Sequence, residues 1–153
     1  MHENLDMPGH LARRFQQIAV SIFHAEAEAH GFDLTPVQYA ALMTISTNPD
    51  IDQVTLAGLI AHDRTTITGV IDRLVRKDLV LRKVSDTDRR ARALCITDAG
   101  EETLRQIQPA VDATQRALLS GLSDDEGAQF LALLRKAIGA LNDRSRAPLR
   151  GQQ

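Results

Sequence analysis

Apolar residues recur every three or four positions through most of this chain, a spacing typical of helices that bury one face. Residues 79–84 and 94–96 instead form two short strand-like stretches on either side of a polar segment. Only 3% of the residues are aromatic and none is Trp, so the core must come mainly from Leu, Ile, Val and Ala. We predict a predominantly helical α+β fold with one β-hairpin.

Capping signals place the first two helices. The apolar stripe through residues 11–29 predicts a long helix that ends near Gly31. Residues 35–38, Thr-Pro-Val-Gln, combine a hydroxyl cap, a proline at the first helical position and a capping-box Gln. We therefore expect a second helix to begin there and to end in the turn-forming residues 47–50.

Two further long helices are expected at the carboxyl end. Thr97 and Ser123 are placed to cap them, and Pro109 should kink the first of the two. These helices and the first helix carry apolar stripes at opposite ends of the chain, so they can pack together and against a second copy. We predict a homodimer.

Two short helices joined by a tight turn are expected between these outer helices. Residues 55–60 and 66–77 have the helical pattern, with His62-Asp63 as the turn. In a helix-turn-helix the second helix presents its N-terminal side chains to the major groove, where Arg and Thr can bond bases or phosphates. The predicted readers are Arg64, Thr65, Thr66 and Thr68. In the alternative interpretation Thr65 only caps the helix and Arg64 is only solvated.

Positive charge is concentrated in the same segment. Residues 64–92 contain nine Lys or Arg against four acidic residues, although the chain has a net charge of −2. The predicted hairpin tip carries Arg89, Arg90 and Arg92, which could reach phosphates or the neighbouring minor groove. A basic solvated face is the alternative, and a winged-helix module that contacts only proteins would not require these arginines.

Several motifs occur together in this order, and in combination they are specific. They are Leu34-Thr35-Pro36-Val37-Gln38-Tyr39, Thr66 to Leu74 with its Asp72-Arg73-Leu74, Leu79-Val80, the segment Asp86 to Arg92, and Leu94 to Gly100. On these motifs the chain, over roughly residues 10–142, resembles the MarR family of bacterial transcription regulators.

The resemblance implies an organisation and a set of DNA contacts. It implies one domain over residues 1–153, with a winged helix-turn-helix lobe at 34–98 and dimerisation helices at 7–31 and 99–145. Thr66, Thr68 and Arg73 would lie in the recognition helix, Asp88 would brace the wing, and Arg90 would enter the minor groove. Asp78 stands where the family often has Gly, although a left-handed cap is open to Asp.

The resemblance also implies a mechanism. Family members typically repress transcription from palindromic sites as dimers and release DNA when a small, often aromatic, anionic ligand binds; we expect an aromatic acid or an acyl thioester. The predicted lining residues are Phe15, Ile18, Ile22, Tyr39 and Met43, with Arg14, His24 or His30 available to a carboxylate. The alternative is that each is ordinary core or surface.

Other functions receive less support. Cys95 is the only cysteine and lies in a predicted strand, so we expect a packed thiol rather than a redox switch. The five histidines all fall at or before His62 without metal-ligand spacing, and we expect no metal or other cofactor. There is no Gly-rich phosphate loop and no Gly-x-Ser-x-Gly motif, so we predict no enzyme.

The expected compartment is the cytoplasm. No apolar run reaches the ~18 residues of a membrane span, and residues 1–8 lack the basic and apolar regions of a signal peptide. One cysteine allows no internal disulfide. We therefore predict a cytoplasmic protein without a membrane partner.

Overall fold

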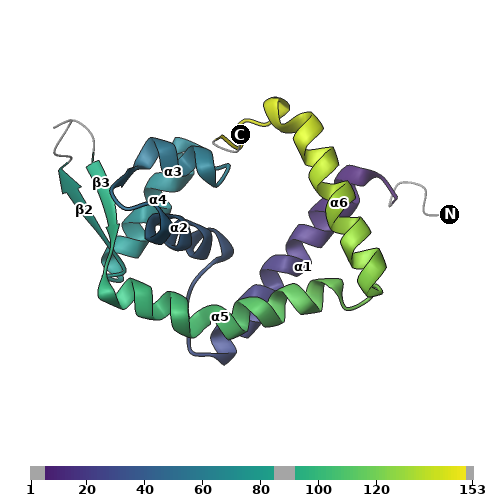
Figure 1. Ribbon diagram of the computed structural model, residues 1–153, viewed down its shortest axis with the longest axis horizontal. Helices are drawn as coiled ribbons and strands as arrows, with labels where there is room; N and C mark the ends of the chain where they lie inside the picture. The colour runs from purple at the N-terminus through teal and green to yellow at the C-terminus, as the bar shows by residue number, and fades with distance from the viewer. Residues whose placement is uncertain (1–5, 85–91, 151–153) are drawn as a thin grey trace.

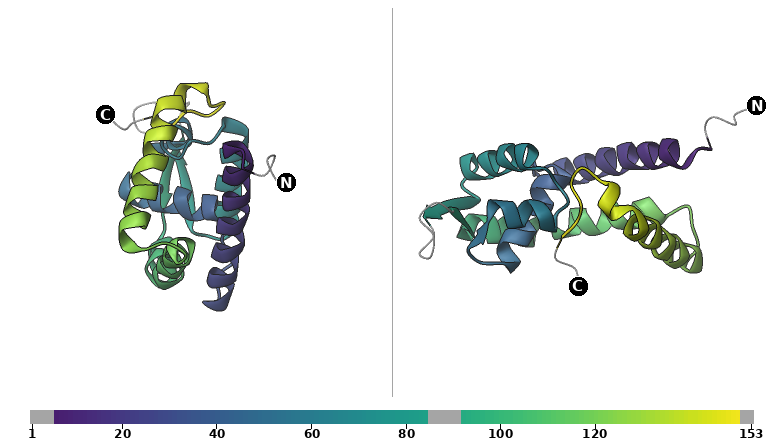
Figure 2. Two further views of the ribbon diagram at one scale, coloured as in Figure 1. Left: turned by 90° about the vertical axis from the view of Figure 1, so that its right-hand side faces the viewer. Right: turned by 90° about the horizontal axis from the view of Figure 1, so that it is seen from above.

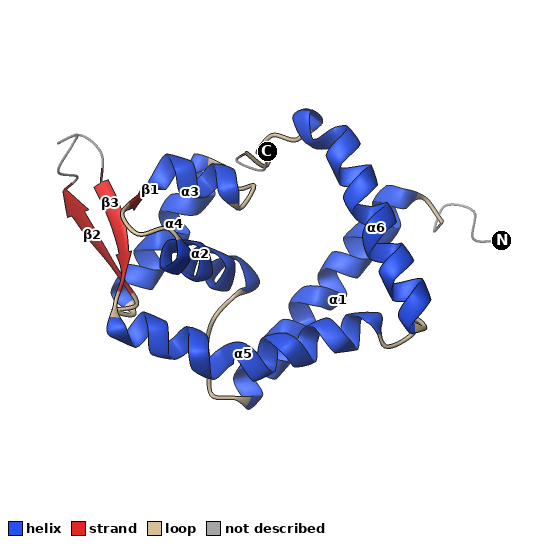
Figure 3. Cartoon of the chain, in the orientation of Figure 1, coloured by secondary structure: helices blue, strands red, loops and turns tan. Residues whose placement is uncertain are grey.

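The computed structural model describes residues 6–84 and 92–150. Figures 1 and 3 show a lobe of short helices and a small sheet at one end, and α1 and α6 at the other, with α5 joining the two. The elements are α1 (Pro8–Ala29), α2 (Pro36–Thr47), β1 (Ile51–Asp52), α3 (Gln53–Leu59), α4 (Arg64–Arg76), β2 (Val80–Val84), β3 (Arg92–Ile96), α5 (Asp98–Leu119), α6 (Asp124–Leu141) and a 3₁₀ turn η2 (Asn142–Arg144). This is the predicted mostly helical α+β fold with a winged helix-turn-helix.

The predicted helix ends are largely confirmed. Thr35 accepts a hydrogen bond from the Gln38 amide at 3.2 Å, and the Gln38 side chain accepts one from the Thr35 amide at 3.2 Å. Together these bonds form a complete capping box at the start of α2. After α1 the chain turns at Gly31, whose φ of 81° suits a residue without a Cβ.

The sheet contains one strand that the sequence analysis missed. The strand order is β1-β3-β2, all antiparallel, so β3 is central. Ile51 of β1 pairs with Leu94, and Arg82 of β2 pairs with Leu94 on the other side. A strand of two residues is too short for alternation to reveal it, so the sequence analysis predicted the hairpin of β2 and β3 correctly but not this third strand.

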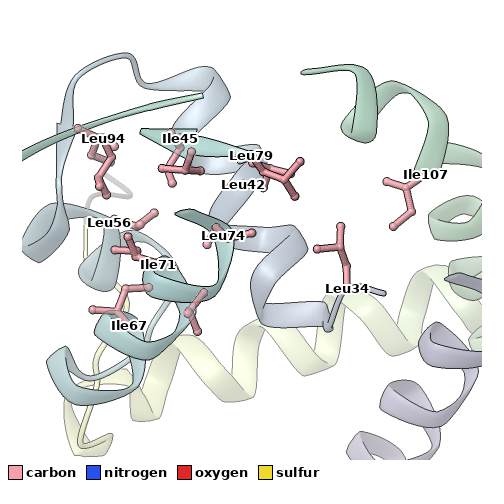
Figure 4. Close-up of a cluster of buried hydrophobic side chains, with 14 of the residues drawn as sticks. Leu34, Leu42, Ile45, Leu56, Ile67, Ile71, Leu74, Leu79, Leu94 and Ile107 are labelled. Atoms are coloured by element: carbon pink, nitrogen blue, oxygen red, sulfur yellow. The ribbon is translucent and has the colours of Figure 1, made fainter. Parts of the chain in front are cut away.

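The core fills the lobe between α2, α3, α4 and the sheet. Figure 4 shows the buried side chains that meet there, with Ile107 of α5 alongside. The largest fully buried ones are Leu42, Ile45, Leu56, Ile67, Ile71, Leu74, Val80, Leu94 and Ile107. The aliphatic core predicted from the lack of aromatic residues is therefore present, and it fixes α4 against the rest of the lobe.

The boundaries of the helix-turn-helix differ from those predicted. Helix α3 begins at Gln53 after its cap Asp52, two residues earlier than expected, and α4 begins at Arg64 rather than Thr66. The cap of α4 is Asp63, whose carboxylate accepts from the Thr66 amide at 2.8 Å. The alternative in which Thr65 caps the helix was therefore wrong. Asp78 follows α4 with φ 57°, the left-handed conformation expected of it.

The outer helices α5 and α6 begin directly after the residues that cap them. Thr97 accepts from the Gly100 amide and Ser123 from the Glu126 amide, so both predicted caps are confirmed. The Glu126 side chain also accepts from the Ser123 amide, which completes a capping box. Helix α5 continues through Pro109 to Leu119. Figure 2 shows α1 and α6 at the end of the molecule away from the sheet. Within residues 6–84 and 92–150, no helix combines the length and apolarity that a bilayer crossing requires.

Candidate nucleic-acid interface

Helix α4 has one buried face and one exposed face. Ile67, Ile71 and Leu74 are fully buried in the lobe core. The other face is polar and exposed, and it carries four predicted DNA-contacting residues: Thr65, Thr66, Thr68 and Arg73. The backbone of Arg64 begins this helix, but its side chain lies outside the described residues. Anchored on one side and polar on the other, α4 has the form of a recognition helix.

The start of α4 is held in place by its cap. Hydrogen bonds from the backbone and side chain of Thr66 lower the pKa of Asp63, with a further contribution from the charge of Arg146. The carboxylate therefore stays ionised and keeps its bond to the first turn. This fixes the position of Thr65 and Thr66 relative to the turn before α4.

A glutamine that the sequence analysis did not select lies on the same surface. Gln53, the first residue of α3, donates from Nε2 to the Thr68 hydroxyl oxygen at 2.6 Å. A glutamine amide can bond the edge of adenine or a phosphate, so Gln53 belongs to the candidate interface. The one feature of the sequence that points to Gln53 is the helix cap Asp52 directly before it, which places Gln53 in the first turn of α3.

An ion pair ties the wing to the recognition helix. Arg82 of β2 hydrogen-bonds Asp72 of α4, and both side chains are partly exposed. Asp72 belongs to the predicted Asp-Arg-Leu motif, whereas nothing in the sequence distinguishes Arg82 from the other basic residues of the segment. The pair restricts how the hairpin sits against α4, so residues on the two elements can act on one DNA site.

Only part of the predicted wing lies in the described chain. Arg92 is exposed at the start of β3 and pairs with Val84 at the end of β2. Asp88, Arg89 and Arg90 lie outside the described residues. Of the three predicted tip arginines, the structure thus places Arg92, at the end of the hairpin where β3 begins.

The predicted ligand residues fall in two places. Arg14, Phe15 and Ile18 line a groove of about 670 Å³ between α1 and α6, where the Phe15 and Phe130 rings meet edge to face at 5.4 Å. The other group is on α2, where the Tyr39 hydroxyl donates to the Met43 sulfur at 3.5 Å.

The α2 group faces α1 through a ring contact. The Tyr39 ring lies 6.1 Å from that of Phe23 on α1. Burial, and then the charge of Asp112, raises the pKa of Tyr39, so its hydroxyl keeps its proton. Of the remaining predicted residues, Ile22 is half-buried and His24 is exposed on α1.

Cys95 has the environment of an unreactive thiol. Its sulfur lies 3.0 Å from Oδ1 of Asp50. Burial raises the pKa of Cys95, and the hydrogen bond to Asp50 and the charge of that carboxylate raise it further. The protonated form is favoured, which opposes redox sensing. In the described parts of the chain, no three His, Cys, Asp or Glu residues are grouped to hold a metal ion.

Comparison with known proteins decides the family. A model of the MarR family matches residues 34–91. The transcriptional regulator HosA of Escherichia coli O111:H- is 32% identical over 108 residues, which are 71% of this chain and 80% of HosA. The chain belongs to the MarR family. It is accordingly a DNA-binding transcriptional regulator and not an enzyme.

Two solved structures of DNA-binding proteins share this fold over most of the chain. The transcriptional repressor CouR, bound to a 23-mer DNA duplex, is 26% identical with a TM-score of 0.81, covering 90% of this chain and 96% of CouR. BpsR of Bordetella bronchiseptica, whose DNA binding is regulated by 6-hydroxynicotinic acid, is 27% identical with a TM-score of 0.81, covering 87% and 94%. Relatives with this fold therefore bind DNA and small ligands.

Proposed function

We propose that this MarR-family regulator binds palindromic operator DNA as a homodimer, with α4 in the major groove and the hairpin tip in the flanking minor groove. The observation that carries the proposal is the exposed polar face of α4, fixed by a buried opposite face and tied to the wing through Asp72 and Arg82. The DNA contacts we propose are Gln53, Arg64, Thr65, Thr66, Thr68, Arg73, Arg89, Arg90 and Arg92, with Asp88 bracing the wing.

The contacts can be tested by fluorescence anisotropy on the intergenic DNA upstream of the gene. We expect Arg73→Ala to weaken binding, and Thr66→Ala to reduce the preference for that DNA over a scrambled duplex. Arg116→Ala on α5 is the control, because Arg116 is exposed and outside the proposed interface. Wild-type-like binding by both α4 variants would refute this assignment.

The proposal of a dimer rests on the exposed apolar surface of α1 and α6. Several large side chains on these helices are about half exposed: Leu11, Ile18, Leu133, Ile138 and Leu141. Exposed apolar surface of this extent commonly marks an interface, and a second copy of these helices offers a matching face. We expect Ile138→Glu to shift the sedimentation coefficient toward that of a monomer, whereas Lys136→Glu, an exposed polar position on α6, should not.

We further propose repression that a small aromatic acid or an acyl thioester relieves. In support, Ile18 and Met43 are large apolar residues that are 47% and 44% exposed on α1 and α2, and Arg14 offers a cation to a carboxylate. The proposed ligand contacts are Arg14, Phe15 and Ile18 in the groove between α1 and α6, Ile22 and His24 farther along α1, and Tyr39 and Met43 on α2. In this mechanism the ligand binds only the conformation in which the two DNA-binding lobes are too far apart or too close to reach both half-sites. Because it stabilises that conformation, it lowers the affinity for DNA.

The ligand is tested by titrating aromatic acids, including 6-hydroxynicotinic acid, and acyl thioesters into the protein–DNA complex. An inducing acid should act less well on Arg14→Ala. Arg13→Ala is the matched control, because Arg13 is the neighbouring exposed arginine and lies outside the groove. A panel with no effect on wild-type DNA binding would refute the aromatic-ligand proposal.

A further inference from the structure

The chain after α6 returns to the helix-turn-helix lobe. In Figure 1 the yellow chain that follows α6 runs to the side of α3. The amide of Arg150 donates to the Gly58 carbonyl in the last turn of α3 at 2.8 Å. We refer to residues 145–150 as the C-terminal strap.

The strap is held in one shape by an asparagine. Asn142 donates from its side-chain amide to the Leu149 carbonyl at 3.0 Å and accepts from the Leu149 amide at 2.9 Å. These two bonds close the loop between the end of α6 and Arg150. Ala147, Pro148 and Leu149 are half-buried, whereas Arg146 and Arg150 are exposed. The apolar part of the strap therefore packs inward while its arginines face solvent.

The strap arginines lie beside the turn that precedes the recognition helix. A hollow of about 540 Å³ is lined by residues of both elements, among them His62 and Asp63 from the turn and Arg146 and Arg150 from the strap. A Cβ built at Gly58 would lie 3.3 Å from the Cβ of Arg150, so the glycine allows the strap to approach α3 closely. The charge of Arg146 also acts on Asp63, the cap of α4.

The charge of this segment suits a polyanion. The strap contains two arginines, Arg146 and Arg150, and no acidic residue. If the first turn of α4 enters the major groove, the residues around its cap lie at the edge of the groove, where the phosphates are. Arginine side chains that project from this position are suited to bind phosphate oxygens.

We propose that the C-terminal strap is an additional DNA-contacting element, in which Arg146 and Arg150 bind operator phosphates beside the N-terminus of α4. This inference rests on the proposed function, because it assumes that α4 occupies the major groove. The contacts add affinity without sequence information, since phosphates are the same at every base pair. They also link the end of α6, in the proposed dimer region, directly to the DNA.

The test is the salt dependence of operator binding by R146Q/R150Q. Removing one arginine–phosphate interaction reduces the slope of log K against log salt by about 0.9, so removing both arginines from both subunits should reduce it by about 3.6. The control is R135Q/K136Q, which removes the same charge from exposed positions on α6. Circular dichroism and sedimentation verify that both variants fold and associate.

A slope for R146Q/R150Q equal to that of R135Q/K136Q would overturn the proposal. A second variant tests whether the docked strap presents the arginines. Asn142→Ala keeps both of them but removes the two bonds to Leu149, so its affinity should fall toward that of R146Q/R150Q; wild-type affinity would contradict this part. If only the strap proposal is wrong, the wild type still binds its operator selectively. If the wild type binds no duplex selectively, the proposed function is wrong as well.

Discussion

Replacing Gly100 with alanine should destabilise the protein through a clash between the wing and α5. Gly100 is buried in the first turn of α5, and its amide donates to the cap Thr97. A Cβ at this position would lie 2.4 Å from the carbonyl oxygen of Leu79 and 2.6 Å from Cγ1 of Ile96. Both distances are well below van der Waals contact, and the first involves a backbone atom that cannot rotate away.

The size of the effect follows from two opposing terms. Inserting one carbon into a packed site typically costs about 1–3 kcal/mol, and the backbone clash places Gly100→Ala at the upper end. Replacing glycine by alanine within a helix returns about 1 kcal/mol. The net loss is therefore about 2 kcal/mol, which for a chain of this size lowers Tm by roughly 4–8 °C.

Thermal and urea unfolding followed by circular dichroism measure this loss. Gly69→Ala is the matched control, because Gly69 lies within α4 and its added Cβ would meet no atom within 4 Å. It should gain up to about 1 kcal/mol from helix propensity alone. All proteins are compared at one concentration, because the proposed dimerisation would make Tm depend on protein concentration. A Gly100→Ala protein as stable as Gly69→Ala would refute the close approach of α5 to the wing.

Two further predictions concern titratable groups. The Thr55 hydrogen bond lowers the pKa of Asp52 in the folded protein. The ionised Asp52 therefore stabilises the fold at pH values above the ordinary pKa of a carboxyl group, and this stabilisation is lost as the pH falls through the lowered pKa. Asp52→Asn should therefore flatten the acid side of the stability profile, and an unchanged acid profile would contradict this. Cys95, whose pKa is raised, should react slowly with iodoacetamide at neutral pH, and Cys95→Ser should bind DNA normally. Peroxide that abolishes DNA binding by the wild type but not by Cys95→Ser would contradict an unreactive thiol.

Features set by neighbouring residues could be predicted from the sequence. The capping box of Thr35 and Gln38 and the cap Ser123 depend on side chains three residues apart, so their spacing alone predicts them. The left-handed conformation of Asp78 was expected on a different ground, because the MarR family often has Gly at this position and Asp can also adopt it. The exposed face of α4 followed from helical periodicity, although the helix begins two residues earlier because Asp63, not a later residue, caps it.

Features set by contacts between distant residues could not be predicted. The strand β1 exists because Ile51 and Asp52 pair with β3, more than forty positions later. Gln53 joins the candidate interface through Thr68, and the strap is placed by the bond between Arg150 and Gly58. Each of these features depends on how several elements pack in the folded protein. Patterns among neighbouring residues of one sequence do not specify that packing.

The most direct test of the central claim is selection of bound sequences from a pool of random DNA duplexes. A dimer that reads DNA through two copies of α4 should enrich a palindrome whose half-site centres lie about one helical turn, or about 10 base pairs, apart, or a multiple of that spacing. Replacement of Thr66 and Arg73 should reduce the enrichment within the half-sites. No enriched sequence, or an enriched sequence without two-fold symmetry, would contradict the account.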